Sequence, residues 1–187
     1  MIAAPLSTRA LLLATLTVLA TLSLSVGACS TGDAGALLAR SDASRSQGAA
    51  PAGDVDAAAE SIRDFGVDLY ALLADRANDG NLVFSPASIV TALAMTYTGA
   101  AGTTAEEMAA TLRFSLDDDS LHQAFNTLDT ALESRSWQGK DPEGEDVGVL
   151  VSTANSLWAQ KDLSFEQEFL DSLAVNYGAG VRLVDYV

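Results

Sequence analysis

Two serine hydroxyls open a long uncharged stretch of the chain. Ser85 and Ser88 stand near the start of Leu82–Ala105, which contains no charged residue. Pro86 lies between them. A serine hydroxyl can accept a hydrogen bond from a free backbone N–H at a helix N-terminus, and proline suits the first helical position. This spacing predicts an apolar helix over 87–98, buried inside a domain, with Ser85 as its N-cap and Ser88 in its first turn.

The side chains that could do acid, base or metal chemistry form no catalytic pattern. His122 is the single histidine, and we expect it to be solvated on the polar side of a helix. Consecutive carboxylates such as Asp117–Asp119 rarely converge on one cation, so a solvated loop or a helix start explains them better. Glu106 with Glu107 fits helix capping. With no G-x-S-x-G elbow and no metal-ligand spacing, the sequence predicts no enzyme, metal site or cofactor.

The single cysteine, Cys29, follows an apolar run. Residues 1–28 contain Arg9, no acidic residue and the apolar segment 11–26, which is typical of a secretory signal peptide. The sequence "VGAC" before and at Cys29 resembles the lipobox of bacterial lipoproteins, in which the cysteine carries the lipid. This predicts an exported protein, anchored by lipid at the cell envelope or extracellular. The alternative is a free thiol in a signal that is cleaved elsewhere. Lipidation is favoured because an isolated cysteine at this position has no disulfide partner.

The charge balance narrows the range of partners. The net charge is −15, and the signal peptide contributes one cation and no acid, so the rest of the chain is more negative still. An acidic surface disfavours nucleic acid and anionic polysaccharide. Residues 29–55 are rich in Ala, Gly and Ser without an aromatic residue, which predicts a flexible tether. The folded domain is expected over 56–187.

Hydrophobic spacing predicts alternating helices and strands in that domain, and therefore an α+β fold. Four further helices are expected: one with the apolar stripe Ile62, Phe65, Leu69 and Leu72, one with a Thr103–Glu106 capping box, one with Leu121, Phe125, Leu128 and Leu132, and one capped by Ser164 and Gln167. Three strands are expected: one over 81–84, one over 149–160 that is covered on both faces, and one over 180–187 with alternating apolar residues. A polar loop is expected over 134–148. These strands need more partners than they supply to one another, so we expect an incomplete domain.

Two blocks of this sequence resemble the serpin family of serine protease inhibitors. The first is "NLVFSPASI" with "GAAGTTAEEM", and the second is "ANSLWAQ" with "FLDSLAVNYGAGVRLVDY". The resemblance covers 56–187 and implies N-terminal helices packed behind part of a central mixed β-sheet. It also implies inhibition of a target serine protease by an exposed reactive loop, which is cleaved and inserts into the sheet. That loop lies near the family's C-terminus and this sequence holds none of it, so we expect a fragment without the reactive bond.

The resemblance to serpins gives Ser85 and Ser88 a second interpretation. In the family, Ser85 and Ser88 lie where the sheet parts, and Asn155 lies in the strand above them as a possible partner. Plain N-capping is the alternative. Acidic Asp129 and Glu133 argue against heparin-like polysaccharide on the helix that binds it in some serpins. A non-inhibitory envelope binding or structural lipoprotein on a serpin scaffold is the alternative function, and the hinge of the reactive loop would distinguish the two.

Overall fold

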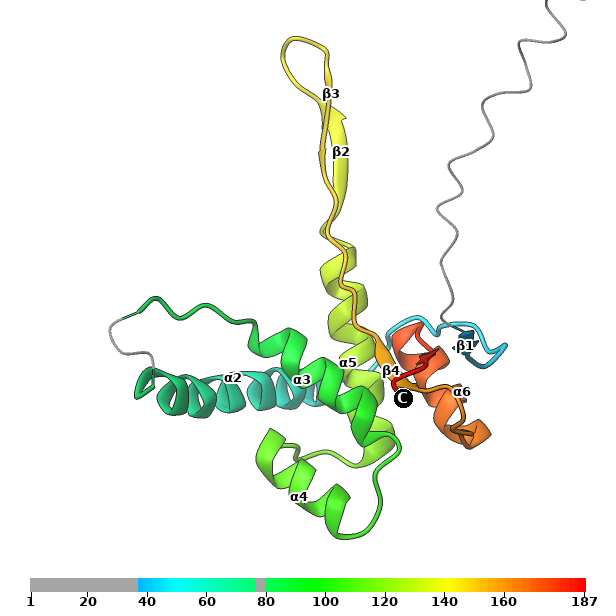
Figure 1. Ribbon diagram of the computed structural model, residues 1–187. Coiled ribbons are helices and arrows are strands. Elements are labelled where there is room, and N and C mark those ends of the chain that lie inside the picture. Colours follow the sequence, from blue (N-terminus) through cyan, green and yellow to red (C-terminus); the bar gives the residue numbers. More distant parts are fainter. Residues whose placement is uncertain (1–36, 77–79) are drawn as a thin grey trace, which may run out of the picture. The chain divides into compact units, whose positions relative to one another are not determined.

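The computed structural model describes residues 37–76 and 80–187 (Figure 1). The predictions for the signal peptide and for Cys29 lie outside these residues. The fold is α+β, as predicted. The helices are α2 (Ala52–Ala74), α3 (Pro86–Tyr97), α4 (Thr103–Leu112), α5 (Asp118–Glu133) and α6 (Gln167–Tyr177). The strands are β1 (Leu37–Ala39), β2 (Trp137–Lys140), β3 (Asp146–Val149), β4 (Leu157–Gln160) and β5 (Val181–Val184).

A mixed sheet has the strand order β1-β5-β4. Strands β4 and β5 are parallel, with Leu157 opposite Val181, and α6 provides the crossover between them. Strand β1 pairs antiparallel with the other side of β5, with Leu38 opposite Arg182. Strands β2 and β3 form a separate antiparallel hairpin, which Figure 1 shows projecting beyond the C-terminal end of α5.

Helix α3 contributes to both clusters of buried side chains. Val90 and Ala94 pack with side chains of α4 and α5, whereas Met95 packs with side chains of α6 and β5. The first cluster is Val90, Ala94, Leu112, Leu121 and Phe125, and the second is Met95, Leu170, Leu173 and Val181. The prediction that α3 is buried on every face is wrong in this structure. Leu93 is 37% exposed because neighbouring elements cover only one side of the helix.

The helix starts follow the sequence signals in part. Two predicted capping pairs are wrong. Gly102, with φ of 58°, is the N-cap of α4, so Thr103 is already the first helical residue. Glu166 is the N-cap of α6, and no side chain caps that end. There Phe165 stacks on Phe169 with ring centroids 5.7 Å apart, so an aromatic contact fixes the entry of the helix in place of a hydroxyl.

The strand predictions need three corrections. The segment 81–84 is extended but pairs with no described strand, and its Val83 is 92% exposed. The polar loop over 134–148 contains the β2–β3 hairpin, because the Asp141 carboxylate accepts from two backbone N–H groups of the turn. The prediction of a single strand over 149–160 is wrong as well. β3 ends at 149, β4 begins at 157, and residues 150–156 between them are irregular and largely exposed.

The tether prediction is wrong for residues 37–55, because this part of the chain packs on the domain. We call residues 37–50 the N-terminal strap. The Ser46 N–H donates to the Val175 carbonyl at 2.9 Å, and the Ala50 N–H donates to the Thr127 hydroxyl at 3.0 Å. A Cβ built on Gly48 would lie 2.4 Å from the Thr127 Cα. The small residues that suggested flexibility therefore permit close approach, and α2 begins at 52 instead of 56.

Candidate functional site

Ser85 and Ser88 form the predicted cap of α3. The Ser85 Oγ accepts from the Ser88 backbone N–H at 3.3 Å, and the Ser88 hydroxyl donates to the same Oγ at 3.0 Å. Pro86 occupies the first helical position. Both serines are exposed. The N-capping prediction is confirmed, and the two hydroxyls also bond each other.

Asn155 lies just before β4, half-buried, in the irregular segment 150–156. It lines an open pocket of 490 Å³ that Ser85 and Ser88 also line. The structure therefore brings the three predicted residues around one pocket. Among the hydrogen bonds of residues 37–76 and 80–187, however, none joins Asn155 to either serine, since Ser88 is turned toward Ser85. The direct partnership expected from the resemblance is absent from this arrangement.

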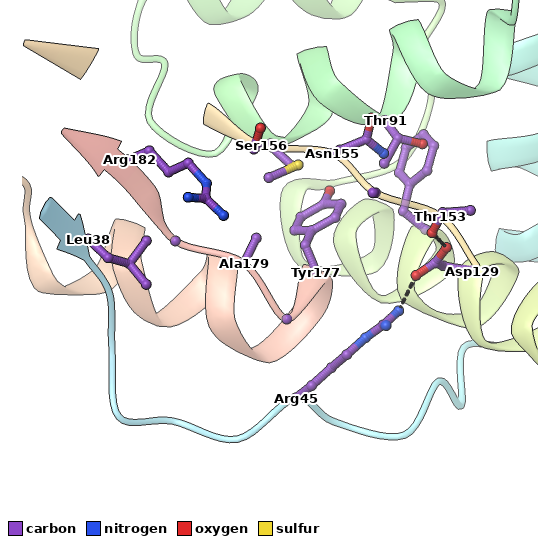
Figure 2. A pocket seen from close by; sticks show the side chains of 15 residues that line it. Leu38, Arg45, Thr91, Asp129, Thr153, Asn155, Ser156, Tyr177, Ala179 and Arg182 are labelled. Atoms are coloured by element: carbon purple, nitrogen blue, oxygen red, sulfur yellow. Dashed lines mark hydrogen bonds and ion pairs between the residues drawn. The ribbon is translucent and has the colours of Figure 1, made fainter. Parts of the chain in front are cut away.

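Asp129 on α5 is the charged centre of the site. One carboxylate oxygen accepts from the Thr153 hydroxyl and the other pairs with Arg45 of the strap at 2.5 Å (Figure 2). The same guanidinium reaches Glu133 at 3.4 Å and the Asn126 side-chain oxygen at 3.3 Å. Asp129 thus joins the strap, α5 and the segment before β4. No local sequence signal identifies it, because its partner Arg45 is 84 residues away.

A second pocket of 280 Å³ adjoins the first along the segment 150–156, because the two share lining residues. Figure 2 shows Arg45 reaching toward Asp129 along one side of it, with Tyr177 and Arg182 on the others. Asp129, Thr153 and Asn155 line both pockets. The irregular segment therefore borders two neighbouring pockets, whereas α3 and α5 carry side chains of the first core cluster.

His122 is not solvated, and that prediction is wrong. It is 4% exposed because α6 packs over α5 and brings the Tyr177 hydroxyl to 2.6 Å from its Nδ1. Its Nε2 lies 3.3 Å from the Thr98 hydroxyl. Burial lowers the pKa of His122, against a smaller opposing effect of Asp118 and Asp119. Burial also raises the pKa of Tyr177. His122 and Tyr177 therefore form a buried, hydrogen-bonded pair.

The acidic run begins α5. Asp117 is its N-cap and accepts from the Ser120 N–H at 3.1 Å, which lowers the pKa of this carboxyl. The interpretation of this run as a helix start is confirmed. Over 37–76 and 80–187, no group of His, Cys, Asp and Glu residues is placed to hold a metal ion. Nor is any helix in these two ranges both long enough and apolar enough to cross a membrane.

Comparison with known families agrees with this architecture. The family model for serpins, described as serine protease inhibitors, matches residues 60–187. That segment includes α3 to α6 and the parallel strands β4 and β5. It also includes Ser85, Ser88 and Asn155, which line one pocket. The chain belongs to the serpin family, a family of protease inhibitors and not of enzymes.

Individual relatives cover the same region. The chain is 39% identical over 125 residues to an uncharacterized serpin-like protein of Thermococcus kodakarensis, and 36% identical over 124 residues to a leukocyte elastase inhibitor of Xenopus laevis. It is 30% identical over 122 residues to the human leukocyte elastase inhibitor. These matches cover 65–67% of this chain but only 27–30% of the relatives. The chain therefore corresponds to less than a third of each relative's length.

Proposed function

We propose that residues 56–187 are the N-terminal part of a serine protease inhibitor that acts by insertion of a reactive loop. The observation that carries this proposal is the family match over residues 60–187. The target would be a serine protease, bound through a loop that this sequence does not contain. Two of the relatives are named leukocyte elastase inhibitors, and this name supports a serine protease as the target of the proposed inhibitor.

The sheet geometry is compatible with this mechanism. Among the described strands, β5 is paired on both sides, whereas β4 is paired only with β5. A strand edge with free N–H and C=O groups is the place where a sheet grows. The strands that complete a serpin sheet would continue from β4, and loop insertion would add one more strand further along.

The pocket around the serines supports a second part of the proposal. Loop insertion requires the sheet to part and slide over the helices behind it. Ser85 and Ser88 satisfy each other, and Asn155 makes no hydrogen bond to them or to any other described residue. We therefore assign Asn155 the role of a side chain that can change partners as the sheet moves. In this role it would bond Ser88 in one state of the sheet and not in the other.

A chimaera tests the proposal. The 187-residue chain is continued by the C-terminal remainder of the Xenopus laevis relative and incubated with leukocyte elastase. The proposal predicts a covalent complex that survives detergent, as for the intact relative, and no complex with the 187-residue chain alone. Cooperative unfolding is the check that the chimaera has folded. A folded chimaera that elastase only cleaves, or a complex formed by the 187-residue chain alone, would contradict the proposal.

We also propose that Cys29 carries a lipid that anchors the protein at the cell envelope. The "VGAC" sequence after the apolar run supports this. Wild type and Cys29→Ala would be expressed in a bacterium and partitioned between aqueous and detergent phases. Wild type should enter the detergent phase and Cys29→Ala should not. Equal partition of the two would refute the lipid.

A further inference from the structure

We propose that the N-terminal strap is a displaceable cover of the β5 edge, and that the uncovered edge accepts the strand Leu37–Ala39 of a second copy of this chain. Two copies would then exchange straps. This inference goes beyond the proposed function. The strap precedes residue 60, where the serpin match begins, so the family match says nothing about it.

The edge of β5 that β1 covers could pair with another strand. Among the strands that the structure describes, β5 has β4 on one side and the three residues of β1 on the other. Without β1, the outer backbone groups of Val181–Leu183 would face solvent, and such an edge is a template for pairing with another chain. Leu37 and Leu38 are 68% and 50% exposed, so burial of apolar surface does little to hold β1 in place.

Polar contacts hold the strap instead. Arg45 is the main link, through its ion pairs with Asp129 and Glu133. Its side chain and that of Asp129 are 24% and 22% exposed, and ion pairs that water can reach contribute little stability. Asn126 is the exception, being 1% exposed, and its amide donates to the Ser46 carbonyl at 3.1 Å and to the Ser46 hydroxyl at 2.7 Å. The strap can therefore leave at a smaller cost than any element of the core.

The positions of these partners favour exchange between copies. Within residues 37–76 and 80–187, the hydrogen bonds that leave the strap end on α5, α6 or β5, including that from the Ser41 hydroxyl to Asp171 on α6. The strap is covalently joined to α2, which supplies none of these partners. A strap from a second copy would meet the same set of groups. Pro51, with φ of −54°, stands between strap and α2, and short stiff links of this kind promote domain swapping.

Exchange has a geometry that two cysteines can detect. Leu38 and Arg182 are opposite each other across β1 and β5. In a Cys29→Ser background, one preparation of the chain carries Leu38→Cys and a second carries Arg182→Cys. The two are mixed in equal amounts and oxidised. A disulfide-linked heterodimer then forms only where the strap of one copy lies on β5 of the other.

Arg45 makes the same contacts in the closed chain and in the exchanged pair, so Arg45→Ala in both copies should leave the equilibrium yield of heterodimer unchanged. It should release the strap more often and raise the initial rate of heterodimer formation about five-fold, the population change expected for loss of a weak contact. Arg45→Lys should restore the slow rate. The matched control is Arg63→Ala, which removes exposed ion pairs within α2 and should change nothing. Leu38→Cys mixed with Trp158→Cys should give no heterodimer, since Trp158 lies on β4, one strand further away.

Three results would overturn the proposal. One is an initial rate of heterodimer formation that does not rise in Arg45→Ala. Another is association of Arg45→Ala without the 38–182 linkage, because the copies would then use another surface. The last comes from a single chain that carries both Leu38→Cys and Arg182→Cys. It should close its disulfide as a monomer when Arg45 is present, and failure to close would show that the strap does not lie on β5.

Discussion

The Nδ1 of His122 lies 2.6 Å from the hydroxyl oxygen of Tyr177, so a buried polar pair joins α5 to α6. Burial favours the neutral imidazole and holds the pKa of His122 below its usual value of 6.5. The unfolded chain therefore binds the histidine proton more readily than the folded chain does. The stability that neutral His122 provides is fully present above about pH 6.5 and is lost progressively as the pH falls below it.

His122→Gln should remove this part of the pH dependence. Gln can keep a hydrogen bond to Tyr177 but does not titrate. We expect the unfolding midpoint of wild type to fall more steeply than that of His122→Gln between about pH 6.5 and pH 5. Denaturant unfolding at a series of pH values measures the difference. Parallel curves for the two proteins would show that His122 titrates as it does in water.

Ser85→Ala should destabilise the fold by about 1 kcal/mol, because it removes the side chain that accepts from the Ser88 N–H at the start of α3. Ser88→Ala is the matched control. It deletes a hydroxyl from the same turn but leaves the cap, so it should cost less than about 0.5 kcal/mol. Equal effects of the two substitutions on the unfolding midpoint would contradict the assignment of Ser85 as the cap.

Asn126→Ala should destabilise the fold by roughly 1–3 kcal/mol, because it leaves polar groups of the strap without their buried partner. Protease digestion should also become faster within residues 37–50, since the strap would be released before the core unfolds. Asn176→Ala is the control, because the side chain of Asn176 donates a hydrogen bond to Ser172 of its own helix and, among the described residues, makes no hydrogen bond to the strap. If both variants were digested at the wild-type rate, the strap would not depend on Asn126.

Gly178→Ala should destabilise the fold by about 1–2 kcal/mol. Gly178 ends α6 with φ of 60°, and an added Cβ would lie 3.1 Å from the Arg45 Cδ. Gly53→Ala provides a contrast within the same protein. Nothing lies within 4 Å of a Cβ at Gly53, in the first turn of α2, so this change should leave the unfolding midpoint unchanged or raise it. A midpoint for Gly178→Ala at or above that of wild type would refute the account.

Local signals in the sequence predicted the parts of the fold that depend on local physics. The order Ser85, Pro86, Ser88 marks a helix start by itself, and it is one. Hydrophobic spacing likewise identified α5, α6 and β5. These elements need only their own residues to be recognised, because capping and amphipathic periodicity are short-range properties.

Contacts between distant residues accounted for most of the failures. His122 looks solvated beside its acidic neighbours, and only the packing of Tyr177, 55 residues later, buries it. Residues 37–50 look like a linker by composition, yet Arg45 finds Asp129 on α5. The β2–β3 hairpin needs pairing between two weakly apolar segments. In each case tertiary contact outweighed local propensity.

In the proposed function, β4 and β5 belong to a sheet that takes up a cleaved loop as a new strand. The most direct test is the thermal midpoint of the chimaera with the Xenopus laevis C-terminal remainder, before and after a protease cuts its reactive loop. An inserted strand adds a ladder of backbone hydrogen bonds and buries further apolar surface. We expect cleavage to raise the midpoint while the chain stays folded. An unchanged or lower midpoint after cleavage would contradict the proposed function.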